Sequence, residues 1–259
     1  MTDDGARGWA QAARIALVVP GDSQVDDEFW RLLAPHGIPF VSRTTGADGS
    51  LMSTKGLAVP HTSDLAASSD MEVAADRLRA VVPAAAAYVD TSISFVRGPA
   101  GAADITERIE RTLRVPTVVT STAVVDAARA LGAARLGVVS VYLEEINETM
   151  PRFFDPQGVK IARIGPLTGH VMSNAETSTE LAQVSPADLV AASRAINGPD
   201  IDAVFIPCTA VRTLEAIEAL EAAIGKPVIT AIRATMWRVA RLAGLGHDAP
   251  LGGRLFEIG

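Results

Sequence analysis

The chain has 259 residues, of which 48% are hydrophobic, so it can bury a sizeable core as one large domain or two small ones. Its net charge of −7 and the lack of any Lys/Arg run argue against a nucleic-acid binder. No apolar stretch approaches the roughly 18–20 residues of a membrane span, and segment 1–9 lacks the apolar region of a secretory signal. A single cysteine cannot form an internal disulfide. We therefore expect a cytoplasmic protein that binds neither nucleic acid nor membrane.

Short β-branched apolar runs alternate with Ala-rich stretches, and their spacing predicts the elements. In chain order we predict a strand at 15–19, helices at 26–33 and 73–82, a strand at 86–89, a helix at 104–113, a strand at 116–119, a helix at 122–131, a strand at 137–141, a helix at 143–154 and a strand at 159–164. Then follow a helix at 187–196, a strand at 203–206, a helix at 214–224, a strand at 227–229 and a helix at 235–242.

Two stretches carry little periodic structure. Residues 44–70 are rich in Ser, Thr and Gly, and form either a mobile loop over a site or an ordinary surface loop. Residues 98–101 are predicted to be a loop as well, and their glycines do not make a dinucleotide-binding fingerprint.

Strands that alternate with helices predict parallel sheets with helices on both faces, which is an α/β fold. The pattern restarts near Ser121, so we expect two pseudo-symmetric, Rossmann-like lobes with the active site in the cleft between them. We place the first lobe at 1–120, completed by the C-terminal segment 232–259. The second lobe is placed at 121–231.

The two halves also repeat one another. An apolar run leads into Asp90-Thr91 in the first half and into Cys208-Thr209 in the second. In both halves a helix follows, and then a short strand after a proline, within 115–119 and 226–230. Either one α/β unit has been duplicated, or the likeness is that of any two strand–turn–helix units. A duplication would place Asp90 and Cys208 opposite one another across the cleft.

Cys208 follows the predicted strand 203–206, at the edge of an α/β sheet where ligands usually bind. A cysteine at a strand-to-helix turn gains acidity from the helix N-terminus, which favours the thiolate. The alternative is a small buried apolar residue, as free cysteines usually are. Pro207 and Thr209 on either side favour an exposed turn, and with it a catalytic thiol.

Asp90 occupies the corresponding place after the strand 86–89, although an aspartate there can simply cap a helix. The hydroxyls and amides of Thr91 and Ser92 come next and can cradle a carboxylate or stabilise an enediolate. Tyr142 follows the strand 137–141 in the same topological position and can add a donor. Pro20 ends the first strand and borders the same edge.

Arg233 follows the strand 227–229, so it either binds a substrate carboxylate in bidentate fashion or lies on the surface. The four histidines lack metal-ligand spacing. The chain contains no Rossmann fingerprint, no Walker loop and no G-x-S-x-G elbow. We therefore expect no metal and no cofactor.

Five segments carry a resemblance to a known family. They are DTSISFVRG at 90–98, STAV at 121–124 followed by ALG at 130–132, Tyr142 with Asn147-Glu148, Cys208 with LEAI at 214–217, and GRLF at 253–256. In this order they resemble the aspartate/glutamate racemase superfamily, and within it the branch of arylmalonate decarboxylase and maleate cis-trans isomerase. The resemblance extends over nearly the whole chain, from 15 to 256.

The resemblance implies two similar lobes, no cofactor, and cysteines that act from opposite faces of the substrate. In maleate isomerases the first cysteine attacks the double bond, whereas arylmalonate decarboxylase has glycine at that position and keeps the second cysteine. Asp90 stands at the first position here and departs from both patterns. A carboxylate is a poor nucleophile toward an alkene and a competent base. Its charge would repel a dianionic substrate unless Asp90 is protonated or the substrate carries a cation.

These residues are compatible with three alternative functions, each with a small carboxylic acid as the ligand. In the first, a malonate-like diacid is decarboxylated: Thr91, Ser92 and Tyr142 stabilise the enediolate, and Cys208 protonates the α-carbon. In the second, Asp90 and Cys208 act as an acid/base pair in a maleate-type isomerase or a racemase. The third is a carboxylate-binding protein without catalysis. The sequence leaves open which acid is bound and whether the protein is a homo-oligomer.

Overall fold

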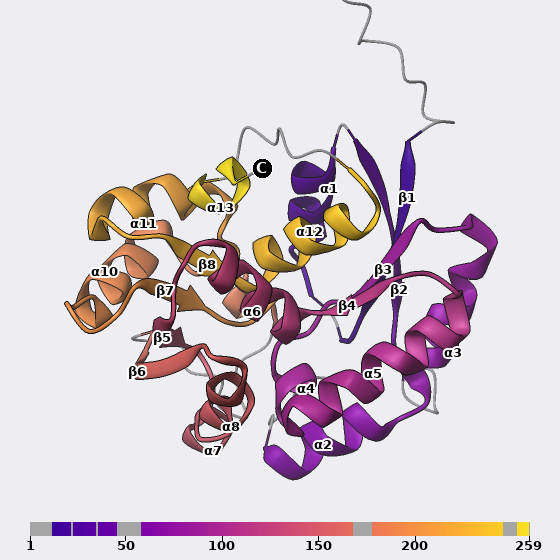
Figure 1. Cartoon of the computed structure of the whole chain (residues 1–259), viewed down its shortest axis with the longest axis horizontal. Coiled ribbons are helices and arrows are strands. Elements are labelled where there is room, and N and C mark those ends of the chain that lie inside the picture. The colour runs from indigo at the N-terminus through magenta and orange to yellow at the C-terminus, as the bar shows by residue number, and fades with distance from the viewer. Residues whose placement is uncertain are drawn as a thin grey trace, which may run out of the picture.

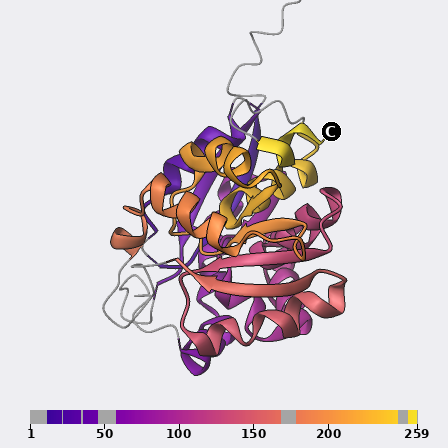
Figure 2. The ribbon, with the colours of Figure 1, turned by 90° about the vertical axis from the view of Figure 1, so that its left-hand side faces the viewer.

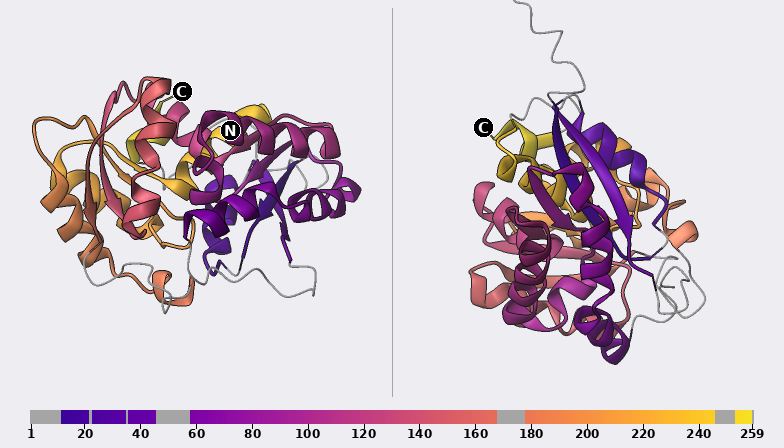
Figure 3. Two further views of the ribbon diagram at one scale, coloured as in Figure 1. Left: turned by 90° about the horizontal axis from the view of Figure 1, so that it is seen from below. Right: turned by 90° about the vertical axis from the view of Figure 1, so that its right-hand side faces the viewer.

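Two parallel sheets organise the computed structural model, which describes residues 12–21, 23–34, 36–45, 58–167, 178–245 and 253–258. Each sheet has four strands in this part of the chain, and all neighbouring strands run parallel. Figure 1 and Figure 3 show the sheets as the centres of two lobes that lie side by side. The helix α6 (Thr120–Ala130) leads from the first sheet to the second.

The first sheet contains β1 (Ala13–Val19), β2 (Gly37–Arg43), β3 (Ala85–Tyr88) and β4 (Thr117–Val119), in the order β2-β1-β3-β4. Residues 15–19 of β1 are fully buried because this strand lies between two others and is covered by helices, as is usual for parallel sheets. The helices α1 (Asp26–Leu33) and α12 (Ala231–Leu242) pack together on one side, and α3 (Asp70–Arg77) and α5 (Gly98–Leu113) on the other (Figure 1).

The second sheet repeats the topology of the first. It contains β5 (Arg135–Ser140), β6 (Lys160–Pro166), β7 (Ala203–Ile206) and β8 (Val228–Thr230), in the order β6-β5-β7-β8. Each strand of the second sheet therefore occupies the same place as the strand numbered four lower in the first sheet: β7 corresponds to β3, and β5 to β1. The helices α10 (Pro186–Ile196) and α11 (Ile217–Ile224) pack on this sheet, and Figure 2 shows them on the side away from the first lobe. The predicted α/β fold with two pseudo-symmetric lobes is confirmed.

The remaining helices and turns complete the described chain. They are α2 (Val59–Ala67), α4 (Ser92–Phe95), α7 (Glu144–Asn147), α8 (Met150–Phe154), α9 (Ser178–Leu181), α13 (Gly253–Glu257) and the 3-10 turns η1 (Arg79–Val81), η2 (Asp155–Gln157) and η3 (Leu214–Ala216).

The last two helices differ in the strands that they contact. The helix α12 contacts β3 and β4 of the first sheet and also β8 of the second, and the assignment of the C-terminal segment to the first lobe stays our proposal. The helix α13 instead contacts α11 and β8 of the second lobe. We therefore propose that only the α12 part of segment 232–259 belongs to the first lobe.

Several sequence-based expectations need correction. The strand β2 was not predicted, because Pro39 interrupts its apolar pattern; at the edge of a sheet, however, proline is tolerated. Within 44–70, which were expected to be a loop, Val59–Ala67 form α2, whereas 46–57 lie outside the described residues. Residues 98–101 form the first turn of α5, since proline fits the start of a helix. The helix expected at 143–154 is divided into α7 and α8.

An aromatic cluster packs between the lobes beneath the ends of β3 and β7. Phe154 of α8 lies 6.3 Å from Phe95 of α4, 5.9 Å from Phe205 of β7 and 4.9 Å from Phe153, measured between ring centroids. All four rings are fully buried. Phe95 belongs to the first lobe and Phe205 to the second, so Phe154 packs against both.

We expect Phe154→Ala to lower the free energy of unfolding by about 3–5 kcal/mol, because a large cavity replaces the central ring of the cluster. Chemical denaturation measures this change. In the control, Val73→Ala, the truncated side chain is 50% exposed, and the free energy should change by no more than about 0.5 kcal/mol. Equal stability of the Phe154 variant and the unmodified protein would contradict the role of the cluster.

Candidate active site

The loops that follow β3 and β7 are hydrogen-bonded to one another. The Cys208 N–H donates to Thr91 Oγ1 over 3.2 Å, and the Thr209 hydroxyl donates to the carbonyl oxygen of Val89 over 3.4 Å. Cys208 and Thr91 are 117 residues apart in the sequence. The structure thus brings together the two strand ends that were expected to face each other, at the sheet edge where α/β proteins bind ligands.

Cys208 has a backbone conformation that is uncommon outside glycine. Its φ angle is +77°, in the left-handed region, and such conformations concentrate at functional sites. The side chain is partly buried, and its sulfur accepts a hydrogen bond from the Ala210 N–H over 3.5 Å. Burial and the nearby charge of Asp90 raise the pKa of the thiol from 9.0 to about 12. The thiol therefore keeps its proton at neutral pH.

The expectation that a helix N-terminus favours the Cys208 thiolate is wrong. The turn η3 begins only at Leu214 and α11 at Ile217, so no helix starts at the cysteine. The hydrogen bonds from Tyr142 and from backbone amides do lower the thiol pKa, but the loss of hydration outweighs them.

Tyr142 joins the cysteine from the end of β5. Its hydroxyl lies close enough to Thr91 and Cys208 for both to influence its pKa, which burial raises well above the usual value of 10. The Tyr142 loop is fixed from within its own lobe. Ser140 Oγ accepts from the Tyr142 N–H over 3.0 Å, and the Asn147 side-chain amide donates to the Tyr142 carbonyl oxygen over 3.2 Å. Sequence reasoning found Asn147 only as part of a motif, and the structure shows how it holds the tyrosine loop.

Asp90 lies at the end of β3, close enough for its charge to raise the pKa of both Cys208 and Tyr142. Its Oδ1 accepts hydrogen bonds from the Ile93 N–H over 2.7 Å and from the Ser92 hydroxyl over 3.4 Å. Burial raises the pKa of the carboxyl group to about 6. Asp90 therefore caps α4 by accepting the Ile93 N–H, which is the alternative role considered above. Its charge also raises the pKa of the Cys208 thiol.

Thr91 and Ser92 are both buried but differ in their connections. Thr91 accepts a hydrogen bond from the Cys208 N–H and lies near the Tyr142 hydroxyl, so it belongs to the immediate surroundings of the thiol. The Ser92 hydroxyl instead orients the carboxylate of Asp90. The two hydroxyls that we expected to form one cradle therefore support different reactive groups.

The loop after β1 reaches the same edge. The Ser23 hydroxyl donates to the carbonyl oxygen of Thr209 over 3.2 Å. The Arg43 guanidinium donates to the carbonyl oxygens of Gly21 and Ser23 over 3.0 and 2.9 Å, which fixes this loop. Pro20 is half-buried at the start of the loop, so it stays a candidate binding residue.

Arg233 does not lie on the surface. Its side chain is fully buried near the start of α12, with the guanidinium 5.0 Å from the ring centroid of Phe256 in α13. Burial lowers its pKa to about 10, and Glu221 and Glu28 act against this shift. Its expected contact with a substrate carboxylate stays a prediction.

Sequence reasoning missed Glu28, a buried carboxylate on α1. Its Oε1 accepts hydrogen bonds from the backbone N–H groups of Thr213 and Leu214 over 2.8 and 3.1 Å. Its spacing could have indicated this burial, because Glu28 lies four residues before Leu32 and therefore on the same, buried face of the helix.

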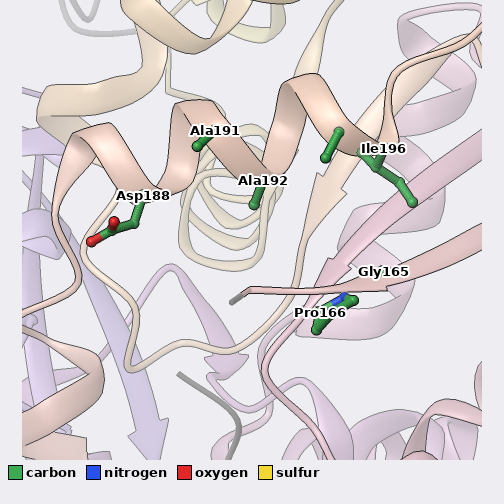
Figure 4. Close-up of a pocket in the computed structure, with 7 residues that line it drawn as sticks. Gly165, Pro166, Asp188, Ala191, Ala192 and Ile196 are labelled. Atoms are coloured by element: carbon green, nitrogen blue, oxygen red, sulfur yellow. The ribbon is translucent and has the colours of Figure 1, made fainter. Parts of the chain in front are cut away.

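A separate cavity of about 350 Å³ lies between the end of β6 and α10. Figure 4 shows Asp188 at one end of a lining that otherwise consists of small or apolar side chains and backbone: Gly165, Pro166, Ala191, Ala192, Ala195 and Ile196. None of the predicted site residues lines this cavity.

Within the described ranges, no three His, Cys, Asp or Glu side chains gather as metal ligands. No helix in the same ranges is long and apolar enough to cross a membrane.

Comparison with known proteins points to one family. Residues 47–256 match the sequence profile described as arylmalonate decarboxylase. The arylmalonate decarboxylase of Bordetella bronchiseptica is 33% identical to this chain, over 71% of the chain and 75% of that protein. A crystal structure of arylmalonate decarboxylase has a TM-score of 0.75 at 26% identity and covers 95% of this chain and 100% of its own.

Maleate isomerases are similar as well. The enzyme of Nocardia farcinica is 26% identical over 94% of this chain and 95% of its own length. A structure of that isomerase with a covalently bound succinylcysteine intermediate has a TM-score of 0.79 at 22% identity, over 95% of this chain and 98% of the other, and shares the fold. The chain is thus an enzyme of the lyase or isomerase type in the aspartate/glutamate racemase superfamily, and it belongs to the arylmalonate decarboxylase family.

Proposed function

We propose that the protein is a cofactor-independent decarboxylase of a malonate-like dicarboxylic acid, with Cys208 as the proton donor. The protonated thiol carries this proposal: burial raises its pKa to about 12, so Cys208 holds a proton at neutral pH and is a poor nucleophile. The 33% identity with a decarboxylase of arylmalonates supports the same reaction class.

In the proposed reaction, one carboxylate leaves as carbon dioxide, and the electron pair of the broken bond passes into the remaining carboxylate as an enediolate. The hydroxyls of Thr91 and Tyr142 lie beside the thiol and would donate hydrogen bonds to the charge that develops. The Cys208 S–H then protonates the α-carbon from one face. Water returns a proton to the thiolate and completes the cycle.

A second candidate is an isomerase or racemase with Asp90 and Cys208 as an acid/base pair. The observation that favours it is the carboxylate of Asp90, whose Oδ1 is held by Ile93 and Ser92 and whose charge reaches the thiol. With a pKa of about 6, this group is a base at neutral pH. A covalent step like that in the succinylcysteine structure is disfavoured, because it needs a nucleophilic thiolate.

Under the main proposal, Cys208→Ala lowers turnover of aryl- or alkylmalonates by about 100-fold or more, since the proton donor is lost. Carbon dioxide release measures the rate. In deuterated water, the unmodified enzyme should yield product labelled at the α-carbon in one configuration. Full turnover by the Cys208 variant, with native circular dichroism, would exclude the thiol as proton donor.

The pH dependence separates the two candidates. For a decarboxylase, kcat/KM for a dianionic malonate should fall as pH rises through about 6, because Asp90 ionises there and repels the substrate. Asp90→Asn should remove this decrease and retain turnover. For the acid/base pair the sign is opposite: kcat/KM rises through the same pH, and Asp90→Asn abolishes α-proton exchange with deuterated water.

The hydroxyl of Thr91 gives a third test. We expect Thr91→Val to lower kcat by about 100-fold, the usual effect of losing one donor to a developing oxyanion. Thr91→Ser keeps the hydroxyl and serves as the matched control. Wild-type kcat in the valine variant would show that Thr91 takes no part in the reaction.

A further inference from the structure

The segment that follows Cys208 is bound to α1 of the first lobe. Arg212 forms a bidentate ion pair with Asp27, at 2.7 and 2.8 Å, and Arg31 pairs with Glu215. Between these two pairs, Glu28 accepts the backbone N–H groups at the start of η3. Three acidic or basic residues of one short helix therefore hold four consecutive residues, 212–215.

These contacts differ in strength because they differ in exposure. The side chains of both ion pairs are one-third to one-half exposed, so water and salt screen them, and such pairs contribute little. Glu28 is fully buried, and its bonds to Thr213 and Leu214 form away from water. A hydrogen bond in a buried environment is electrostatically stronger than the same bond in water. Glu28 therefore dominates the attachment.

The attachment has a defined structural role. The first N–H groups of a helix lack partners within it, and here the acceptor comes from a residue 185 positions away, in the other lobe. At the other end of the segment, Cys208 and Thr209 are bound to Thr91 and Val89. The chain from 208 to 214 is thus tied to the first lobe at both ends. Cys208 has a backbone conformation in the left-handed region, which persists only when surrounding contacts hold it in place. The contacts at both ends of the segment provide this.

We infer that Glu28 is a positioning residue for the Cys208 thiol: by accepting the Thr213 and Leu214 N–H groups, it holds the segment 208–214 in the conformation that places the sulfur beside Thr91 and Tyr142. The inference rests on the proposed function for its meaning in catalysis. That Glu28 positions the Cys208 thiol does not depend on which reaction the thiol serves.

The bonding pattern of Glu28 shows how to test this. Both hydrogen bonds go to Oε1, while Oε2 is buried and accepts no hydrogen bond from the described residues. Glu28→Gln keeps an oxygen at the same reach and removes the charge. Glu28→Asp keeps the charge and draws the oxygen back by one methylene. A positioning role through hydrogen bonds and a role through charge therefore predict opposite rankings of the two variants.

The experiment uses the single cysteine, since a thiol reagent such as iodoacetamide then reports on Cys208 alone. The rate of alkylation is followed against pH in the unmodified protein and the variants. We expect Glu28→Asp to change the rate or shift its pH profile by at least about tenfold, because the shorter side chain loses two buried hydrogen bonds. Glu28→Gln should stay within about threefold. Asp27→Asn, which weakens the exposed pair on the same helix, should stay within about twofold.

An unchanged alkylation profile in Glu28→Asp, or a larger change in Glu28→Gln than in Glu28→Asp, would overturn the inference. Denaturation curves for each variant show that the native state is the one alkylated. For substrate turnover, the inference predicts that Glu28→Asp lowers kcat more than it raises KM. Because alkylation needs no substrate, it tests the positioning role even if no malonate is turned over, so failure of the proposed function is distinguishable from failure of this inference.

Discussion

The hydrogen bond from the Cys208 N–H to Thr91 Oγ1 is the contact on which the site depends. It joins the ends of β3 and β7, and with them the two lobes. The same threonine lies near the Tyr142 hydroxyl, so a thiol, a phenol and a strand end meet at one side chain. This arrangement requires Cys208 to adopt a left-handed conformation, which the surrounding contacts must maintain. The attachment to α1 is therefore part of the site although it touches no reactive atom.

Burial of the site also determines its electrostatics, because it raises the pKa values of Cys208, Tyr142 and Asp90. Asp90 raises the pKa of Cys208 and Tyr142, and no cation of the described chain is among the groups that shift the pKa of Asp90 itself. Under the proposed function, hydroxyls and backbone dipoles of the described residues would bind a substrate carboxylate beside these groups. Such fixed donors favour charge that develops during a reaction, because they need no reorganisation when it appears. An enediolate fits this requirement better than a diacid ground state.

The strand–helix alternation predicted both lobes, because parallel strands buried on two faces read as continuous apolar runs. The repeat also predicted that Asp90 and Cys208 follow equivalent strands, as β3 and β7 show. What depended on tertiary packing was not predictable. The direction of the Cys208 pKa shift is set by burial, and the surroundings of Arg233 are set by Phe256 from α13. Sequence reasoning did not single out Glu28, because only the fold brings η3 to it.

Equivalent positions in the two lobes hold different acids, and this asymmetry has a chemical consequence. A carboxyl group with a pKa of about 6 and a thiol with a pKa of about 12 are six units apart, so near neutral pH one is mostly ionised while the other is fully protonated. If Asp90 and Cys208 form the acid/base pair of the second candidate function, the thiol would be the proton source and the carboxylate the acceptor. Two thiols in the same positions would lack that polarity. In that reaction, the carboxylate at the end of one repeat would determine from which side an α-carbon receives its proton.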